Sequence, residues 1–416
     1  MIKQLVKKFF NKLFNLLTTI KLHHDMKEVI KNVPRLVSLM RQKDKIKVLF
    51  ILPCLSKWKT ETLYRAMVKH PRFDPIIGLA LMTLDYPSEA VRKYYQLTEY
   101  IKNKKYKYSE ICNCGDLKTI NPDIIFLQEA SGGGINKTLS FNYYKNCLYC
   151  YIPYGYNWTN ERLLINTPYH NICWKFFCES PLFLGYAKTV MDNKGKNIVF
   201  TGLPMTDEFL LKQNLFKNTW NGNNTKKRII WAPHHSIGQK DILQMGTFLS
   251  YAEKMCTLAQ KYSDSTQWVF KPHPVLRGKL NLLWGKSKTD EYYKWWEEAA
   301  NTQVADGEYV DFFKYSDALI HDCGSFMVEY LYMNKPCMFL DNGKKHKLNL
   351  LGQKCYEKHY LGHTAEDIEQ FIINTINGID PIKPYRESFI QKYLLPPNGK
   401  TSCENIICEI LNEKLQ

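Results

Sequence analysis

The chain has 416 residues, of which 45% are hydrophobic, so its length and composition indicate a globular protein of two ordinary domains and exclude a disordered or fibrous chain. Lys and Arg number 57 against 40 Asp and Glu, and the formal net charge of +17 favours an anionic partner such as a phosphorylated substrate, an acidic lipid or nucleic acid. No run approaches the roughly 20 apolar residues that a transmembrane helix needs.

Residues 1–40 predict a basic amphipathic helical segment. Its apolar side chains recur three or four positions apart, at Ile2, Leu5, Phe9, Leu13, Leu16 and Ile20, and lysines lie at positions 3, 7, 8, 12 and 21. This pattern is typical of a helix that lies on an anionic membrane surface. The alternative is a helix packed on the protein's own core.

Strand-like runs then alternate with helical patterns almost throughout, which is typical of α/β units with parallel sheets. In the first half we expect strands at 46–52, 76–80, 123–127, 148–152 and 197–204, and helices at 61–69 and 88–102. Residues 169–177 are apolar and fit either a helix or a strand. Cys147 and Cys150 form an isolated CxxC among 13 scattered cysteines. The pair is explained either by a zinc or redox site or by reduced thiols in the core. The scattered cysteines favour a reducing cytoplasm as the compartment.

The polar stretch 217–227 predicts a linker or an exposed loop before a second α/β set. There we expect strands at 228–233, 268–270, 318–320 and 337–340, and helices at 243–261, 290–300, 325–333, 365–376, 388–393 and 400–413. The predicted architecture is two Rossmann-like doubly wound domains, 41–205 and 206–385, that face across a cleft and are followed by C-terminal helices in 386–416. Ligands bind at the carboxyl ends of the strands in such sheets.

The sequence Lys271-Pro-His-Pro274 follows a predicted strand, so His273 is expected on a loop at the carboxyl end of that strand. The two prolines restrict the backbone on either side of the imidazole. A histidine held in this way can donate to a phosphate oxygen or neutralise charge on a leaving group, although an ordinary turn histidine is the alternative.

A second anion-suited element is the run from His321 to Glu329, in which a buried strand breaks at small residues and a helix begins near Gly324 and Ser325. Free backbone N–H groups at a helix start favour an anion. Asp322, Gly324 and Ser325 are candidates to hold phosphate, with a plain N-cap as the alternative for Ser325. Glu329 is one turn further on and could accept a hydrogen bond from a ribose or polyol hydroxyl, or could be a surface residue.

The strand at 228–233 ends in Pro233-His234-His235, which we interpret as polar residues of the same cleft. Adjacent histidines are badly placed to share one metal and no carboxylate is spaced to help them, so metal binding is the minor alternative. The stretch Ser131-Gly-Gly-Gly134 lacks the spacing of a dinucleotide-binding loop.

Together these motifs resemble those of the CDP-glycerol glycerophosphotransferase family, the teichoic-acid and capsule polymerases and primases with a GT-B fold. The resemblance rests on residues 271–274, 315–330 and 335–340, is extended by 151–155, 231–233 and 398–402, and spans roughly residues 120–410.

The resemblance implies that residues 206–385 bind a CDP-activated donor and that residues 41–205 face the acceptor. Glycerol phosphate, or a related polyol phosphate, then moves to a lipid-linked saccharide acceptor in cell-surface polysaccharide synthesis. The acceptor hydroxyl attacks the phosphorus attached to the polyol, and CMP leaves. No metal or cofactor is implied, and the enzyme is expected at the cytoplasmic face of the membrane as a peripheral protein.

The resemblance also assigns the site. His273 matches the family's diphosphate-binding histidine and is a catalytic candidate, while Gly324 and Ser325 fall where a serine pair grips the donor phosphates. The other residues implied in donor binding are Lys271, Asp322, Glu329, Pro233 and His234.

Two departures from the family stand out. Cys323-Gly324 replaces the usual Tyr-Ser, so one donor hydroxyl is missing. Tyr154 occupies the place of the histidine proposed as the family's general base, and tyrosine, with an ordinary pKa of about 10, is a poor base at neutral pH. The further candidates for the base are Glu129, His170 and His235.

Two alternatives remain open at this point. One is a glycosyltransferase that uses a CMP- or UDP-sugar, because bacterial sialyltransferases also pair a His-Pro loop with a serine-bearing loop. The other is a non-catalytic nucleic-acid-binding protein, which the scattered basic residues and the lack of an RRM-like or finger motif disfavour.

Overall fold

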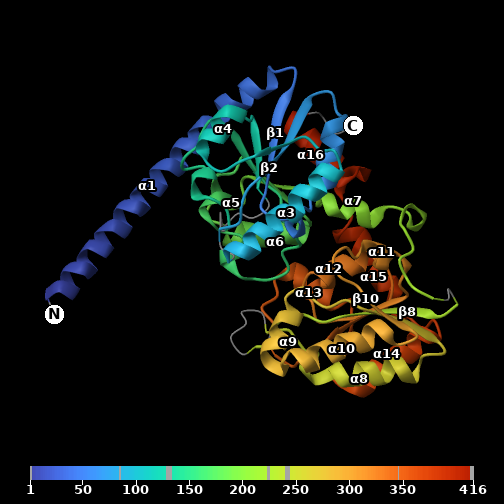
Figure 1. Cartoon of the computed structure of the whole chain (residues 1–416). Coiled ribbons are helices and arrows are strands. Elements are labelled where there is room, and N and C mark those ends of the chain that lie inside the picture. The colour runs from blue at the N-terminus through green and yellow to red at the C-terminus, as the bar shows by residue number, and fades with distance from the viewer. Residues whose placement is uncertain are drawn as a thin grey trace. The chain divides into compact units, whose positions relative to one another are not determined.

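Two parallel β-sheets with helices between their strands form the protein, so the predicted α/β class is confirmed (Figure 1). This computed structural model describes residues 2–83, 86–127, 134–222, 225–238, 244–344 and 346–412. The chain divides into two compact units. Unit 1 comprises residues 1–155, 161–205 and 396–416, and unit 2 comprises 156–160 and 206–395.

The sheet of unit 1 has seven strands in the order β3-β2-β1-β4-β5-β6-β7. The chain builds outward from β1 in one direction and then from β4 in the other, which is the doubly wound arrangement predicted from the sequence. The strands are β1 (Ile46–Leu52), β2 (Phe73–Leu79), β3 (Tyr108–Glu110), β4 (Ile124–Leu127), β5 (Leu148–Tyr151), β6 (Lys175–Cys178) and β7 (Ile198–Phe200). Phe50 of β1 stacks on Phe126 of β4 at 4.9 Å between ring centroids, in the middle of the core.

The ambiguous stretch 169–177 contains both kinds of element. Helix α5 (Pro168–Ile172) is followed directly by β6, because Asn197 closes the short connection by donating to the carbonyls of His170 and Cys173, each at 2.8 Å. The remaining helices of this unit are α2 (Glu61–Lys69), α3 (Pro87–Asn103), α4 (Cys114–Ile120), α6 (Pro181–Val190) and the C-terminal α16 (Ser402–Leu411). Cys147 and Cys150 are buried as free thiols, as expected of core cysteines.

Helix α1 (Ile2–Arg41) has two parts that differ in their surroundings. From Asp25 onward it packs on unit 1, where Val29 and Met40 are buried and Lys145 bridges Asp25 and Glu28, both at 2.5 Å. In contrast, every described side chain between residues 12 and 21 is exposed, including four large apolar ones, Phe14, Leu16, Leu17 and Ile20. Packing on the protein's own core therefore explains only the second part. Among the described residues, no helix is both long and apolar enough to cross a bilayer.

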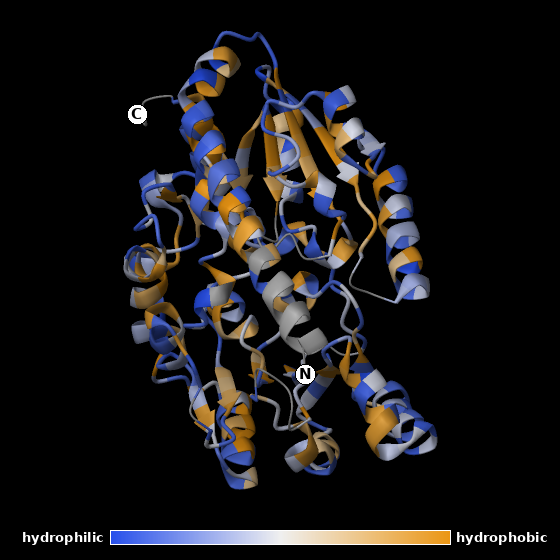
Figure 2. Cartoon of the chain, turned by 90° about the vertical axis from the view of Figure 1, so that its left-hand side faces the viewer, coloured by the Kyte–Doolittle hydropathy of each residue, from blue (hydrophilic) through white to orange (hydrophobic). Residues whose placement is uncertain are grey.

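The sheet of unit 2 has six strands in the order β10-β9-β8-β11-β12-β13. They are β8 (Lys227–Ala232), β9 (Thr266–Phe270), β10 (Thr302–Val304), β11 (Ala318–His321), β12 (Cys337–Leu340) and β13 (Tyr360–Gly362). In Figure 2 the strands of both units are coloured mainly as hydrophobic, as expected for parallel sheets covered on both faces.

One face of this sheet carries an aromatic core in which Trp231, Trp268, Phe270 and Trp296 are fully buried. It is covered by α8 (Phe248–Lys261), α9 (Leu276–Trp284), α10 (Lys286–Glu298) and α14 (Ala365–Ile376). The other helices of unit 2 are α11 (Val310–Tyr315), α12 (Phe326–Glu329), α13 (Leu350–Tyr356) and α15 (Lys383–Tyr393), and α7 (Pro204–Leu210) straddles the boundary between the units.

Lys335, which lies within the family-like motif at 335–340, closes the end of α11. Its ammonium group donates to the carbonyls of Phe313, Lys314 and Ser316 at 3.1, 2.7 and 2.6 Å. Burial lowers the pKa of this lysine to about 8. The side chain thus satisfies carbonyls that the helix end leaves free.

The predicted helix at 325–333 is shorter and more irregular in the structure. Only α12 is α-helical, and the chain continues as a 3-10 turn, η5 (Tyr330–Met333), which ends at Asn334 in the left-handed region with φ of 50°. A single α-helical turn has little cumulative dipole, so individual N–H groups matter more here than a helix dipole.

Candidate functional site

The carboxyl ends of three adjacent strands of unit 2 bring the predicted donor-binding residues together. Strand β8 lies between β9 and β11, with Trp231 beside Phe270 and Ala232 beside His321. The loops that follow these strands are tied to one another. The His273 N–H donates to the Pro233 carbonyl at 3.1 Å, and the next residue, His234, donates its N–H to Asp322 at 2.5 Å.

Three imidazoles, those of His234, His235 and His273, cluster on these loops. The ring of His235 lies 4.3 Å from each of the other two, and the rings of His234 and His273 are 5.4 Å apart, measured between centroids. His234 is buried, while His235 and His273 are partly buried. The sequence predicted these residues in one cleft, and the structure brings their three rings together.

The proton of neutral His234 can be placed from its neighbours. Ser236 Oγ accepts from the backbone N–H groups of Met245 and Gly246 at 3.1 and 2.8 Å, so its own proton is directed at His234 Nδ1, 2.8 Å away. The Ser236 N–H also points at this nitrogen, at 3.2 Å. Nδ1 is therefore an acceptor, and the ring carries its proton on Nε2.

His273 is held in the same state. Its Nδ1 accepts from the Val275 N–H at 3.2 Å. Burial, with further contributions from His235 and two lysines, lowers its pKa to about 4, so the ring is neutral at physiological pH. A neutral ring with Nδ1 occupied presents an N–H donor at Nε2, which suits an oxyanion.

The three histidines are also one of two groups among the described residues that could hold a metal ion, since one ring nitrogen from each lies within 4.8 Å of the others. A metal would need the lone pair on Nε2, and the contacts of His234 and His273 leave a proton there. Metal binding would therefore require both rings to change tautomer. His24, Asp25 and Glu28 form a second such group, but Lys145 already forms an ion pair with each of the two carboxylates.

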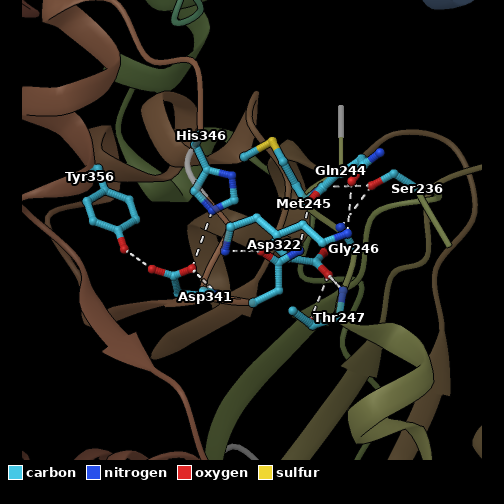
Figure 3. Close-up of polar contacts among 12 residues, drawn as sticks. Ser236, Gln244, Met245, Gly246, Thr247, Asp322, Asp341, His346 and Tyr356 are labelled. Carbon is cyan, nitrogen blue, oxygen red and sulfur yellow. Dashed lines mark hydrogen bonds and ion pairs between the residues drawn. The ribbon is translucent and has the colours of Figure 1, made fainter. Parts of the chain in front are cut away.

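Asp322 is the centre of a buried network that fixes two of these loops (Figure 3). Its carboxylate accepts from the His234 N–H, and from the Thr247 N–H and hydroxyl at 2.5 and 2.9 Å. The side chain is fully buried, and burial raises its pKa to about 6 in spite of these donors. Asp322 therefore positions the histidine loop and the start of α8, and it has no exposed surface to offer a ligand.

A fourth loop, after β12, adds polar residues that the sequence reasoning missed. Asp341 accepts a hydrogen bond from the Tyr356 hydroxyl and lies 3.5 Å from His346 Nε2 (Figure 3). The signal was available in the sequence, because Asp341-Asn-Gly follows a predicted strand directly and should lie at the same edge of the sheet as Asp322.

Gly324 and Ser325 differ from the simple expectation of a capped helix. The hydroxyl of Ser325 is exposed and makes no capping hydrogen bond, and its backbone is already helical with φ of −63°. Ser325 is thus the N-cap residue of α12 by position, but its side chain does not cap the helix. The hydroxyl remains available to a ligand.

The absence of a side chain at Gly324 has a packing cause. A Cβ at this position would lie 2.0 Å from Cζ2 of Trp158, a residue of the short segment 156–160 that belongs to unit 2. Trp158 is 8% exposed, and its carbonyl also approaches Gly352 closely. The departure from the family's serine at 324 is thus coupled to a tryptophan that the sequence reasoning did not single out.

Glu329 is buried, so the surface alternative for this residue is wrong. Its carboxylate accepts from the Tyr309 hydroxyl at 2.6 Å. The ammonium of Lys271, another buried residue, lies 5.6 Å from the centre of the Tyr309 ring. The three side chains form one polar group, with Glu329 bound to a tyrosine rather than displayed alone.

The candidates for the general base have different environments. Tyr154 is 47% exposed, and the Lys57 ammonium lies 5.5 Å from its ring centre within unit 1. His170 is 1% exposed, and burial lowers its pKa to about 3, so it is a structural residue of the α5 cap and not an accessible base. Glu129 and residues 131–133 of the glycine stretch lie outside the described residues.

Comparison with known proteins agrees with the geometry. Residues 185–391 match the sequence profile of the family described as CDP-Glycerol:Poly(glycerophosphate) glycerophosphotransferase. No curated protein sequence shows significant similarity to the chain. The predicted resemblance is confirmed over the matched residues, which include every predicted donor-binding residue.

Solved structures share the fold at low sequence identity. The H548A variant of the wall teichoic acid polymerase TagF is 14% identical, with a TM-score of 0.58 over 95% of this chain and 99% of that chain. A TagF H444N structure soaked with CDPG gives 14% and 0.57 over the same shares. A putative UDP-N-acetylglucosamine 2-epimerase from Listeria monocytogenes gives 14% and 0.57 over 88% of this chain and 96% of that chain. The predicted GT-B class of fold is thereby confirmed.

Proposed function

Because the chain is a CDP-glycerol glycerophosphotransferase-like enzyme, we propose that it transfers glycerol phosphate, or a related polyol phosphate, from a CDP-linked donor to a cell-surface polymer precursor. The observation that carries this proposal is the neutral ring of His273 at the carboxyl end of β9, whose Nδ1 is occupied and whose Nε2 carries an N–H donor, with the rings of His234 and His235 beside it. Such donors complement the oxygens of a diphosphate.

In the proposed reaction an acceptor hydroxyl attacks the phosphorus that carries the polyol. The bond from this phosphorus to the bridging oxygen breaks, and CMP leaves with that oxygen. His273 and His234 donate to the diphosphate oxygens as negative charge shifts to the leaving group, and Lys271 adds positive charge behind them. Positioning and charge neutralisation provide most of the catalysis, and neither a metal nor another cofactor is required.

The general base takes the proton of the acceptor hydroxyl. Of the candidates, His235 lies within the histidine cluster, whereas Tyr154 belongs to unit 1. Measuring the pH dependence of turnover in His235→Gln and Tyr154→Phe separates the two. Loss of the low-pH limb of the profile, where protonation of the base suppresses turnover, in only one variant identifies the base.

The acceptor is proposed to be a lipid-linked saccharide reached from the cytoplasmic face of the membrane. The exposed apolar side chains of α1 between residues 14 and 20, together with nearby Lys12 and Lys21, support peripheral attachment to an anionic surface.

A donor panel tests the proposed function. The purified chain is incubated with a lipid-linked acceptor and with CDP-glycerol, CDP-ribitol, CMP-sialic acid or UDP-N-acetylglucosamine, and nucleotide release is measured. We expect acceptor-dependent CMP release only from the CDP-polyols. Release from CMP-sialic acid or from the UDP-sugar alone would contradict the proposal and support the sugar-donor alternative, which also fits the fold shared with UDP-N-acetylglucosamine 2-epimerases.

A further inference from the structure

Unit 1 contains an apolar cavity that the donor site does not use. Its volume is about 240 Å³, and it lies at the carboxyl end of β4, beside the point where α1 meets the unit. The apolar residues that line it are Leu22, Leu127, Ile135, Leu139, Phe141 and Tyr169. Ligands of doubly wound sheets bind at this edge.

The cavity borders the end of the exposed part of α1. Phe14, Leu16, Leu17 and Ile20 are each more than half exposed, and the next apolar residue of the helix, Leu22, is partly buried and lines the cavity. Successive residues of an α-helix turn by about 100°, so these side chains lie on different sides of α1, and Leu22 is the one of them that lines the cavity.

A charged residue of the lining indicates what the ligand carries besides hydrocarbon. Lys137, an exposed residue, is part of the lining and offers a positive charge.

We infer that this cavity binds the hydrocarbon chain of an anionic amphiphile, namely the lipid part of the acceptor. The identity of the lipid as acceptor rests on the proposed function; the binding of such an amphiphile does not. A cavity of about 150 Å³ holds one benzene molecule, and pockets of about 300 Å³ and more hold whole drug-sized ligands. The volume of this cavity lies between the two. It therefore fits a short length of one chain.

The probe for the test is lauroyl lysophosphatidic acid, kept below its critical micelle concentration and titrated into the full chain by calorimetry. Glycerol 3-phosphate is the control for the head group alone. We expect the lipid to bind at least tenfold more tightly than glycerol 3-phosphate. Affinity should rise about fourfold with each added methylene in a chain-length series, and it should level off once the cavity is filled.

Two variants locate the binding site. Leu22→Glu places a carboxylate in the cavity, and Ile135→Trp fills it; each is expected to weaken binding of the lipid at least tenfold. Leu16→Glu is the matched control, because it adds the same charge on the exposed part of the same helix, and it should change binding of this soluble probe less than twofold. Urea unfolding midpoints within the wild-type range show that the variants are folded.

The inference is overturned if folded Leu22→Glu and Ile135→Trp bind the lipid as the wild type does, if Leu16→Glu weakens binding equally, or if affinity rises with chain length without levelling off. CMP release in the donor panel is measured separately. Lipid binding that disappears in the cavity variants while the CDP-polyols release no CMP would uphold the cavity and reject the proposed transferase.

Discussion

Trp158 lies against the backbone of Gly324, where a Cβ would approach the indole Cζ2 to 2.0 Å. The tryptophan comes from the segment 156–160, far from the glycine in sequence, and both belong to unit 2. The contact explains why this chain carries no hydroxyl at a position where the related family has a serine.

Substituting Gly324 should therefore destabilise the fold, and the size of this effect should depend on the side chain at position 158. We expect Gly324→Ala to lower the free energy of unfolding by about 1–3 kcal/mol through overpacking. Combining it with Trp158→Ala should show a favourable coupling of about 0.5–3 kcal/mol in a double-mutant cycle measured by urea unfolding. Gly278→Ala is the control, since a Cβ there meets no atom within 4 Å, and it should not destabilise. Strictly additive effects of the two substitutions would contradict the contact.

Asp322→Asn should disrupt the histidine loop as well as stability. One carboxylate oxygen faces the His234 N–H and the other faces two donors of Thr247, so an amide group must turn its NH₂ toward an N–H. We expect a loss of about 1–3 kcal/mol in unfolding free energy for the unsatisfied donor. Donor turnover should fall at the same time. Asp290→Asn, on the surface of α10, should change neither measurement by as much.

His273→Gln should weaken use of the donor without a large loss of stability. Hydrogen bonds to charged groups contribute about 1.5–3 kcal/mol, so kcat/KM for the CDP-linked donor should fall about 10- to 100-fold. Steady-state nucleotide release checks this, and His24→Gln on the exposed surface of α1 serves as control. Wild-type turnover in His273→Gln would remove the central residue of the proposed mechanism.

Stability should fall with acidification because of His170. Burial lowers its pKa to about 3 in the folded protein, whereas an unfolded chain has the ordinary value of about 6.5. Below pH 6.5 the unfolded state binds a proton that the folded state does not, so the free energy of unfolding decreases as pH falls. This residue alone should remove about 2 kcal/mol between pH 7.5 and pH 5.

Urea unfolding of wild type and His170→Asn at these two pH values measures the effect. The loss of unfolding free energy between pH 7.5 and pH 5 should be about 2 kcal/mol smaller in His170→Asn than in the wild type. Asp322 acts in the opposite direction, because its raised pKa of about 6 favours the folded state as pH falls below that value. An equal pH dependence in wild type and His170→Asn would show that His170 is not responsible.

Deleting residues 1–21 should abolish membrane attachment and leave the chemistry intact. The segment holds five lysines, and at about 1 kcal/mol per basic residue near an anionic surface, binding to anionic vesicles should fall more than a hundredfold. Turnover on a soluble acceptor should stay within twofold of wild type. Unchanged sedimentation with anionic vesicles would refute the anchor.

The sequence predicted an element well where its residues favour only one kind of local structure. Apolar runs such as 46–52 and 337–340 became strands with the predicted bounds, and Lys271-Pro-His-Pro274 lies on the predicted loop. The short edge strands β10 and β13, of three residues each, were not predicted, because a run of three residues is too short to show a periodic pattern. The mixed stretch 169–177 was ambiguous because its helix and strand follow each other almost without a connection.

The arrangement of the site was predictable only in outline. Parallel strands with polar loops at their carboxyl ends placed the histidines and Asp322 at one edge of the sheet. Whether Asp322 faced a ligand or the protein depended on Thr247, whose position at the start of α8 no local pattern reveals. The partners of Gly324 and Glu329 are likewise distant in sequence, so packing and not periodicity decided them.

The clamp formed by Lys335 around three carbonyls bears on how relatives of this chain should be judged. A lysine in that role stabilises the end of α11 beside the sheet, and this role does not depend on the residues of the loops that form the candidate site. A relative that keeps Lys335 but has another residue in place of His273 can therefore match this chain in sequence and still lack the proposed transfer activity. Inactive paralogues should be sought among chains of that kind.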